Sequence, residues 1–211
     1  KKANRYFSML VYFTILAGIL LTVLGIIFVR PMAELFGADE SMMDTCVLYG
    51  RIVIAFNAAF MLQNIFQSFF VVAEKPRLGL IVTIAAGVTN MVLDALFVGV
   101  FKWGIVGAAL ATGISQSIGG LLPLLYFALP NNSPLQLTRT GFELAPLLKA
   151  SSNGCSELMS NVASSLIGIM YNYQLMRLGG ENAVATYGVL MYIQFVFIAI
   201  FIGYSVGSAP I

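Results

Sequence analysis

The sequence predicts an all-α, polytopic membrane bundle of about six membrane-spanning helices. Only 9% of its 211 residues are charged, 59% are hydrophobic, and the mean hydropathy is +0.91. A soluble domain carries about 25% charged residues, because its surface must face water. Six apolar segments are each long enough to cross a bilayer, for which about 20 residues suffice. We therefore expect lipid to be the solvent for most of the chain.

The six apolar segments are separated by short polar breaks. The expected spans are Leu10–Val29, Thr45–Ala73, Leu78–Phe101, Trp103–Leu129, Ala145–Met176 and Ala183–Ile211. The breaks are rich in proline, glycine and charged residues, which are typical of turns. The longest polar connection predicts a linker at residues 130–144 between four helices in residues 1–129 and two helices in residues 145–211. Lys1 and the apolar run around Ile211 suggest a piece of a longer protein.

Lysines and arginines in short loops predict the orientation of the spans. If the N-terminal end is cytoplasmic, the inner loops hold Lys1, Lys2, Arg5, Lys75, Arg77, Arg139 and Lys149. The outer loops then hold only Arg30, Lys102 and Arg177. We therefore expect the N-terminal end of the chain on the cytoplasmic side, with the 130–144 linker on that side as well.

Charge and residue types exclude several classes of function. The net charge is only +2 without a basic cluster, so nucleic acid is not an expected partner. Histidine is absent and the cysteines are Cys46 and Cys155, which argues against zinc sites, haem attachment and cysteine–histidine catalysis. We expect no cofactor, and we expect both cysteines to be buried small apolar residues.

Two carboxylates lie within the expected spans, Asp94 and Glu157. Such a group costs about 3 kcal/mol at mid-membrane and usually lines a cavity or an ion path. Asn90 precedes Asp94 by one helical turn, and Thr112 lies at a similar depth on the next span. Their oxygens suit a proton or a small cation such as Na⁺. The alternative is a hydrogen-bonded cluster between helices.

Glu157 belongs to a polar stripe along one face of the fifth span. Its members are Asn153, Glu157, Asn161, Ser164, Gly168 and Asn172. A stripe of this length requires a water-filled cavity or another polar helix. The second span carries further polar residues that either line a cavity or bind helices together: Tyr49, Asn57, Gln63, Asn64, Gln67 and Ser68.

The most specific motifs are Thr89–Asp94 (TNMVLD) and Trp103–Thr112 (WGIVGAALAT). They resemble the fifth and sixth helices of the multidrug and toxic compound extrusion (MATE) family. Phe66-Gln67-Ser68 ahead of Glu74–Arg77 is similar to the end of that family's fourth helix. Asn153–Glu157 (NGCSE) is similar to the start of its seventh helix. The resemblance runs through most of the chain and assigns it to helices three to eight of twelve.

The resemblance implies a plasma-membrane antiporter with two six-helix lobes and a central cleft that exchanges cationic drugs for H⁺ or Na⁺. It matches Asn90, Asp94 and Thr112 to the cation site of the N-lobe. Tyr49 and Asn64 match fourth-helix positions, and Glu157 matches the seventh-helix acid. Asn153, Asn161, Asn57 and Gln67 would line the cleft with Glu157. The first-helix aspartate and helices nine to twelve are absent here, so the missing helices of the same transporter are expected partners.

Three alternatives remain open at this stage. A flippase for lipid-linked precursors, in the same wider superfamily, would need fixed cations for phosphate, and the spans contain only Arg51. A non-transporting membrane scaffold would show no ion-dependent drug binding. An intramembrane enzyme is disfavoured, because metal-binding histidines, a paired-aspartate signature and a serine–histidine couple are absent.

Overall fold

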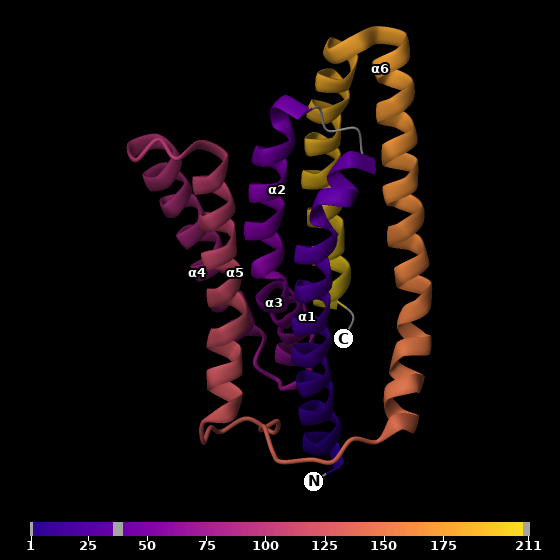
Figure 1. The fold of residues 1–211 in the computed structure, drawn as a ribbon. Helices are drawn as coiled ribbons and strands as arrows, with labels where there is room; N and C mark the ends of the chain where they lie inside the picture. The colour runs from indigo at the N-terminus through magenta and orange to yellow at the C-terminus, as the bar shows by residue number, and fades with distance from the viewer. Residues whose placement is uncertain (1, 36–39, 209–211) are drawn as a thin grey trace. The chain divides into compact units, whose positions relative to one another are not determined.

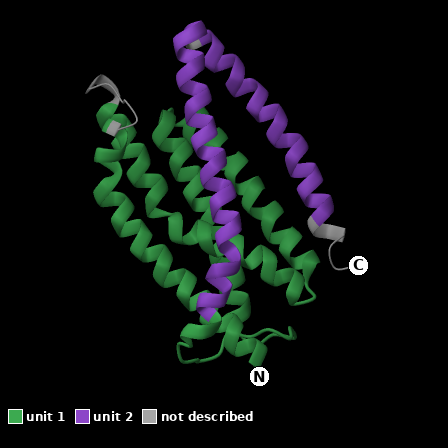
Figure 2. Ribbon diagram, turned by 90° about the vertical axis from the view of Figure 1, so that its right-hand side faces the viewer, with its two compact units in different colours: residues 1–146 green, residues 147–211 purple. Residues whose placement is uncertain are grey.

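The computed structural model describes residues 2–35 and 40–208, and this part of the chain is helical without strands. Two compact units are present, residues 1–146 and 147–211, and each is described by itself (Figure 2). The helices are α1 Lys2–Leu35, α2 Glu40–Ala55, α3 Asn57–Val72, α4 Pro76–Asp94, the π-helix η1 Ala95–Val100, α5 Gly104–Ala128 and α6 Leu144–Ser208 (Figure 1).

Small residues let the helices of the first unit approach closely. A Cβ added at Gly18 of α1 would lie 2.9 Å from the Cα of Ala58 on α3. A Cβ added at Gly120 of α5 would lie 2.6 Å from the carbonyl oxygen of Ala59. Such contacts are typical of membrane bundles, where van der Waals packing of small residues replaces the hydrophobic driving force.

The second expected span is a broken helix. Helices α2 and α3 meet at Phe56 with a bend of 44° between them. The N–H of Phe56 donates to the carbonyl of Val53 at 3.2 Å, a tight turn that interrupts the α-helical pattern. Asn57, one of the expected cleft residues, is therefore the first residue of α3.

The third expected span changes its helical pitch directly after Asp94. Helix α4 ends at this residue, and η1 continues the span to Val100. The N–H of Phe101 then donates to the carbonyl of Leu96 at 2.9 Å, a bond across five residues. Short π-helical segments inside α-helices occur frequently at functional sites.

An aromatic core closes one end of the first unit. The ring of Phe7 on α1 contacts two other rings edge-on. Its centroid lies 4.7 Å from that of Phe69 on α3 and 5.1 Å from that of Phe127 on α5. The segment after α5 seals this core, since Leu135 is buried in it and the N–H of Thr138 donates to Oγ of Ser8 at 2.8 Å. The start of α1, the turn from α3 to α4 and residues 130–143 therefore lie at the same end.

The second unit consists mainly of two arms of α6 joined at Gly180. This glycine has φ +64° and ψ −160°, a conformation that interrupts the helix and that glycine adopts readily. The arms contact each other near this break, where the rings of Tyr171 and Tyr187 stack at 5.5 Å.

The number of helices that qualify as membrane spans is lower than the expected six. By length and composition, four of the described helices qualify, Lys2–Glu34, Pro76–Val100, Gly104–Ala128 and Asn182–Ser205, or five if the bent α2–α3 pair is one span. The first arm of α6 does not qualify. Its polar stripe around Glu157 lowers the mean hydropathy of a helix that is otherwise long enough.

Candidate functional site

Asp94 and Asn90 form the least satisfied polar pair that was expected from the sequence. Both side chains are half-buried on α4, one helical turn apart. Oδ1 of Asp94 and Nδ2 of Asn90 are buried and have no hydrogen-bond partner within residues 2–35 and 40–208. A buried polar atom without a partner costs about 1–3 kcal/mol, and more when it carries charge. The pair is therefore a place where a cation, a proton or water would lower the free energy.

Thr112 lies at the level of this pair on the antiparallel helix α5. The π-helix η1, which continues α4, touches α5 where a Cβ added at Gly107 would lie 2.9 Å from the Cβ of Phe97. Counting about 1.5 Å per residue from this contact puts Thr112 within about 3 Å of the level of both Asn90 and Asp94. No hydrogen bond joins these three side chains in the described part of the chain, so a shared cation remains a prediction.

The break between α2 and α3 lies at this level too. The ring of Phe56 packs directly on Gly113, the residue after Thr112. Asn57 follows Phe56, which puts it within about 3 Å of the level of Thr112 at 1.5 Å per residue. Its Nδ2 has only Met61 Sδ as a partner, at 3.7 Å. Asn57 was assigned to the cleft from the sequence. In the structure it lies nearer to the level of Asn90 and Asp94 than Tyr49, Asn64 and Gln67 do, the other candidates on α2 and α3.

Thr22 of α1 is a polar residue that the sequence reasoning missed. It is half-buried, and its Oγ1 is buried without a partner. It lies between Gly18, which touches Ala58, and Gly25, which touches Ile54, and therefore at the level of Phe56. A lone threonine in an apolar run gives little signal, because threonine hydroxyls commonly bond to their own helix. Its unpartnered hydroxyl became evident only from the packing.

Tyr49 and Asn64 lie away from this level. Tyr49 is seven residues before Phe56 and Asn64 eight residues after it, which corresponds to about 10 Å and 12 Å along the helices. Tyr49 is 43% exposed. Asn64 is exposed and donates to the carbonyl of Phe60 on its own helix at 2.9 Å. In this conformation neither side chain contributes an observed contact to Asn90, Asp94 or Thr112.

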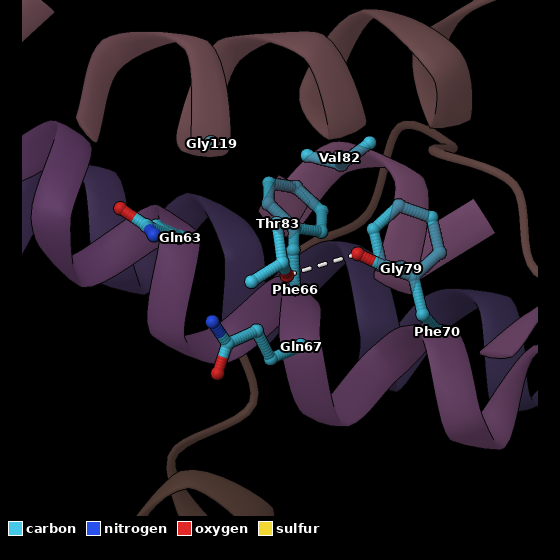
Figure 3. Close-up of a pocket in the computed structure, with 8 residues that line it drawn as sticks. All are labelled: Gln63, Phe66, Gln67, Phe70, Gly79, Val82, Thr83 and Gly119. Atoms are coloured by element: carbon cyan, nitrogen blue, oxygen red, sulfur yellow. Dashed lines mark hydrogen bonds between the residues drawn. The ribbon is translucent and has the colours of Figure 1, made fainter. Parts of the chain in front are cut away.

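Gln67 lines a small cavity between α3, α4 and α5 (Figure 3). The cavity has a volume of about 10 Å³, enough for about one water molecule. Gln63 lines it as well, and its Oε1 is buried without a partner. Thr83 borders the same space and donates to the carbonyl of Gly79 at 2.9 Å. Gln67 therefore belongs to a polar pocket nearer the aromatic core than Asp94.

The polar stripe of the fifth span lies on the first arm of α6. Asn153, Glu157 and Asn161 are exposed, and Asn161 donates to the carbonyl of Glu157 at 2.9 Å. Ser164 and Gly168, further along the stripe, line a pocket of about 400 Å³ beside Tyr171 and Tyr187. The stripe thus faces the second arm at one end, while Glu157 lies among exposed residues at the other. No contact tests its proposed role in a cleft.

The chain is similar to known multidrug transport proteins. A profile of the MatE family matches residues 1–96. Multidrug export protein MepA of Staphylococcus haemolyticus (strain JCSC1435) is 24% identical over 212 residues, which cover 100% of this chain and 46% of that protein. Probable multidrug resistance protein YoeA of Bacillus subtilis (strain 168) is 29% identical over 93% of this chain and 45% of its own length.

A solved structure agrees as well. It is described as the inward-facing conformation of a multidrug resistance MATE family transporter of the MOP superfamily. It superposes with a TM-score of 0.77 over 90% of this chain and 43% of that chain, at 19% identity. The chain thus has the fold of a MATE transporter, and its residues 1–96 match the MatE family profile. It spans about half the length of the curated relatives that it matches.

The MATE profile covers only part of the candidate site. The matched residues 1–96 include Asn57, Asn90 and Asp94, whereas Thr112 and Glu157 lie beyond them. The MATE fold extends further, since the structural match covers 90% of the chain. The sequence match to the MatE family therefore ends at the start of η1, and for most of the remainder the similarity is one of fold.

Proposed function

We propose that this chain forms the cation-binding part of a multidrug efflux antiporter, which exports organic cations in exchange for H⁺ or Na⁺. The observation that carries this proposal is the buried, unpartnered carboxylate oxygen of Asp94 beside the unpartnered amide of Asn90. Relatives of the chain are named as multidrug export proteins, which supports the assignment of cargo. The proposed membrane is the plasma membrane, with the end that carries Lys2 and Arg5 in the cytoplasm.

The proposed cation site uses three kinds of oxygen. Asp94 supplies a carboxylate, Asn90 an amide oxygen once its amide group turns, and Thr112 a hydroxyl. Hard oxygens of this kind bind small cations such as Na⁺, and a carboxylate alone suffices for a proton. Because Oδ1 of Asp94 has no hydrogen-bond partner among the described residues, a cation or proton that binds there does not have to break a hydrogen bond.

Coupling follows from competition for the same carboxylate. A ligand shifts a two-state equilibrium only by its differential affinity for the two states. If Asp94 is neutralised by H⁺ or Na⁺ in one state and left charged in the other, a cationic drug gains affinity where the carboxylate is free. Glu157 is proposed as a second protonatable group on the drug pathway. The broken helix at Phe56 and the π-helix after Asp94 are proposed as the elements that absorb the conformational change.

The test is dye efflux from vesicles that contain the full-length protein. A fluorescent organic cation is loaded, and first a pH gradient and then a sodium gradient is imposed. We expect one of the two gradients to drive efflux in the wild type and to drive none in Asp94→Asn. Retention of gradient-driven efflux in that variant would refute the role of Asp94.

A matched variant separates loss of coupling from general damage. Asp44→Asn neutralises an exposed carboxylate of α2, which lies about 18 Å along the chain axis from Phe56 at 1.5 Å per residue. We expect Asp44→Asn to transport as the wild type does. An effect equal to that of Asp94→Asn would assign the defect to net charge instead of the site.

A further inference from the structure

A groove opens at the turn between α3 and α4, away from the polar pair around Asp94. It is lined by Glu74, Lys75, Pro76, Arg77, Leu78, Ile81 and Tyr126 and has a volume of about 540 Å³. Volumes of about 300–1,000 Å³ are typical of small-molecule sites. Nothing in the proposed antiport mechanism uses these residues.

The turn that builds the groove is held by its own backbone. The N–H of Lys75 donates to the carbonyl of Phe70 at 2.9 Å, and the N–H of Glu74 donates to Val71 at 3.1 Å. With Glu74 at φ +57°, these bonds form a Schellman motif that ends α3. The N–H of Leu78 then donates to the carbonyl of Lys75 at 3.0 Å, which starts α4. The two basic residues are therefore fixed to a well-ordered backbone.

The two basic side chains of the groove, Lys75 and Arg77, form no ion pair in the part of the chain that the structure describes. Glu74 is the only acid in the lining, so the groove carries two cations against one anion. The end of the unit has further basic residues, because Lys2 and Arg139 lie on segments that meet there, while Arg5 at this end is paired with Glu143.

The remaining walls are apolar and aromatic. Leu78 and Ile81 extend along α4 from the charged rim toward the apolar part of the span, and Ile81 is 62% exposed. Tyr126 contributes an aromatic ring near the end of α5, the kind of residue that is enriched at the membrane–water interface. A ligand that fits must therefore be anionic at one end and apolar at the other.

We propose that this groove binds an anionic phospholipid, with the phosphate headgroup at Lys75 and Arg77 and an acyl chain along Leu78 and Ile81. Basic pockets between membrane helices on the cytoplasmic side bind anionic headgroups in this way. The lipid would bridge the α3–α4 turn and the end of α5, which meet at this site. The proposal requires that this end of the unit lies at the membrane–water interface. It does not depend on which substrate the protein transports.

Native mass spectrometry of the purified full-length protein tests this site. Phosphatidylglycerol and phosphatidylcholine are titrated separately, and the bound fractions are compared between wild type, Lys75→Ala/Arg77→Ala and Arg30→Ala/Lys102→Ala. The last variant removes the same charge from the opposite end of the unit. We expect the groove variant to lose about thirtyfold in affinity for phosphatidylglycerol, since each basic residue contributes about fivefold near an anionic headgroup. The control variant should bind as the wild type does.

Two further measurements keep the outcome unambiguous. Glu74→Gln removes the only acid of the groove and should raise the affinity for phosphatidylglycerol, a gain that misfolding does not produce. Glycerol phosphate is tested as a competitor that has the headgroup phosphate without acyl chains. Equal loss in the groove and control variants would overturn the proposal. Binding of glycerol phosphate as tight as that of the lipid would assign the groove to free phosphate and overturn it too.

Discussion

The ring of Phe56 lies against the backbone of Gly113, so closely that α5 has no room for a single methyl group at this position. Phe56 is the residue at which α2 and α3 bend, and Gly113 follows Thr112. The contact therefore places the bend between α2 and α3 at the same level along the bundle as the proposed cation site. The position of Asn57 depends on the same contact, because it begins α3 directly after Phe56.

Gly113→Ala should destabilise the first unit and impair transport together. The added methyl group would displace the Phe56 ring, and overpacking of this kind costs about 1–3 kcal/mol. Thermal unfolding in detergent and the vesicle efflux assay measure the two effects. Gly87→Ala is the control, because a Cβ there meets nothing within 4 Å. Equal melting temperatures for the two variants would contradict the packing described here.

Thr22→Val should stabilise the protein by about 1 kcal/mol, because it replaces a buried hydroxyl without a partner by a methyl group of similar shape. Thr14→Val is the matched change on the same helix, and its hydroxyl donates to the carbonyl of Leu10 at 2.9 Å. We expect this control to be neutral or destabilising. If Thr22→Val instead lowers ion-dependent efflux without raising stability, the hydroxyl serves the ion path.

Glu74→Gly should raise the thermal stability. Glu74 adopts φ +57° at the end of α3, a left-handed conformation that costs a side-chain-bearing residue about 1–2 kcal/mol and glycine very little. Differential scanning of the purified variant measures the change. Arg77→Gly provides the comparison within α4, where glycine should cost about 1 kcal/mol. A loss of stability in Glu74→Gly would show that a contact of its carboxylate stabilises the protein by more than the left-handed backbone conformation costs.

Asn57→Ala should weaken ion-dependent transport more than Asn64→Ala. Both changes remove an asparagine side chain from α3, but Asn57 lies near the level of Thr112 and Asn64 about 12 Å from it. The half-maximal ion concentration for efflux is the measurement. An equal or larger effect of Asn64→Ala would favour Asn64, the residue that the family resemblance assigns to the site. It would argue against Asn57, the residue that the structure places near the level of Thr112.

The sequence was sufficient for the class of fold and for the pair on α4. Hydropathy predicted six spans, of which four or five are long and apolar enough among the described helices. The spacing of Asn90 and Asp94 by one turn predicted that they share one face of a helix. Only the structure shows that Asn90 and Asp94 each have a buried atom without a partner, because burial depends on how α5 and its glycines pack. Thr22 was not recognised as a functional candidate for the same reason, whereas Gln63 was among the residues expected either to line a cavity or to bind helices together.

Local features without a pattern signal were harder to predict. Thr45–Ala73 was expected as one span, because nothing around Phe56 breaks a helix by composition. In the structure the span bends at Phe56, where the ring packs on Gly113. The π-helix after Asp94 lacks a sequence signature as well. The fifth span was predicted from its length. Because of its polar stripe, its mean hydropathy is lower than that of the helices that qualify as spans.

Direct ion binding is the most decisive measurement for Asp94. Radioactive sodium uptake and proton release are followed on the purified full-length protein, for wild type, Asp94→Asn and Asp44→Asn. The account predicts that wild type and Asp44→Asn bind one of the two ions with equal stoichiometry, while Asp94→Asn loses one equivalent. Unchanged binding in Asp94→Asn, with the protein still folded, would contradict it.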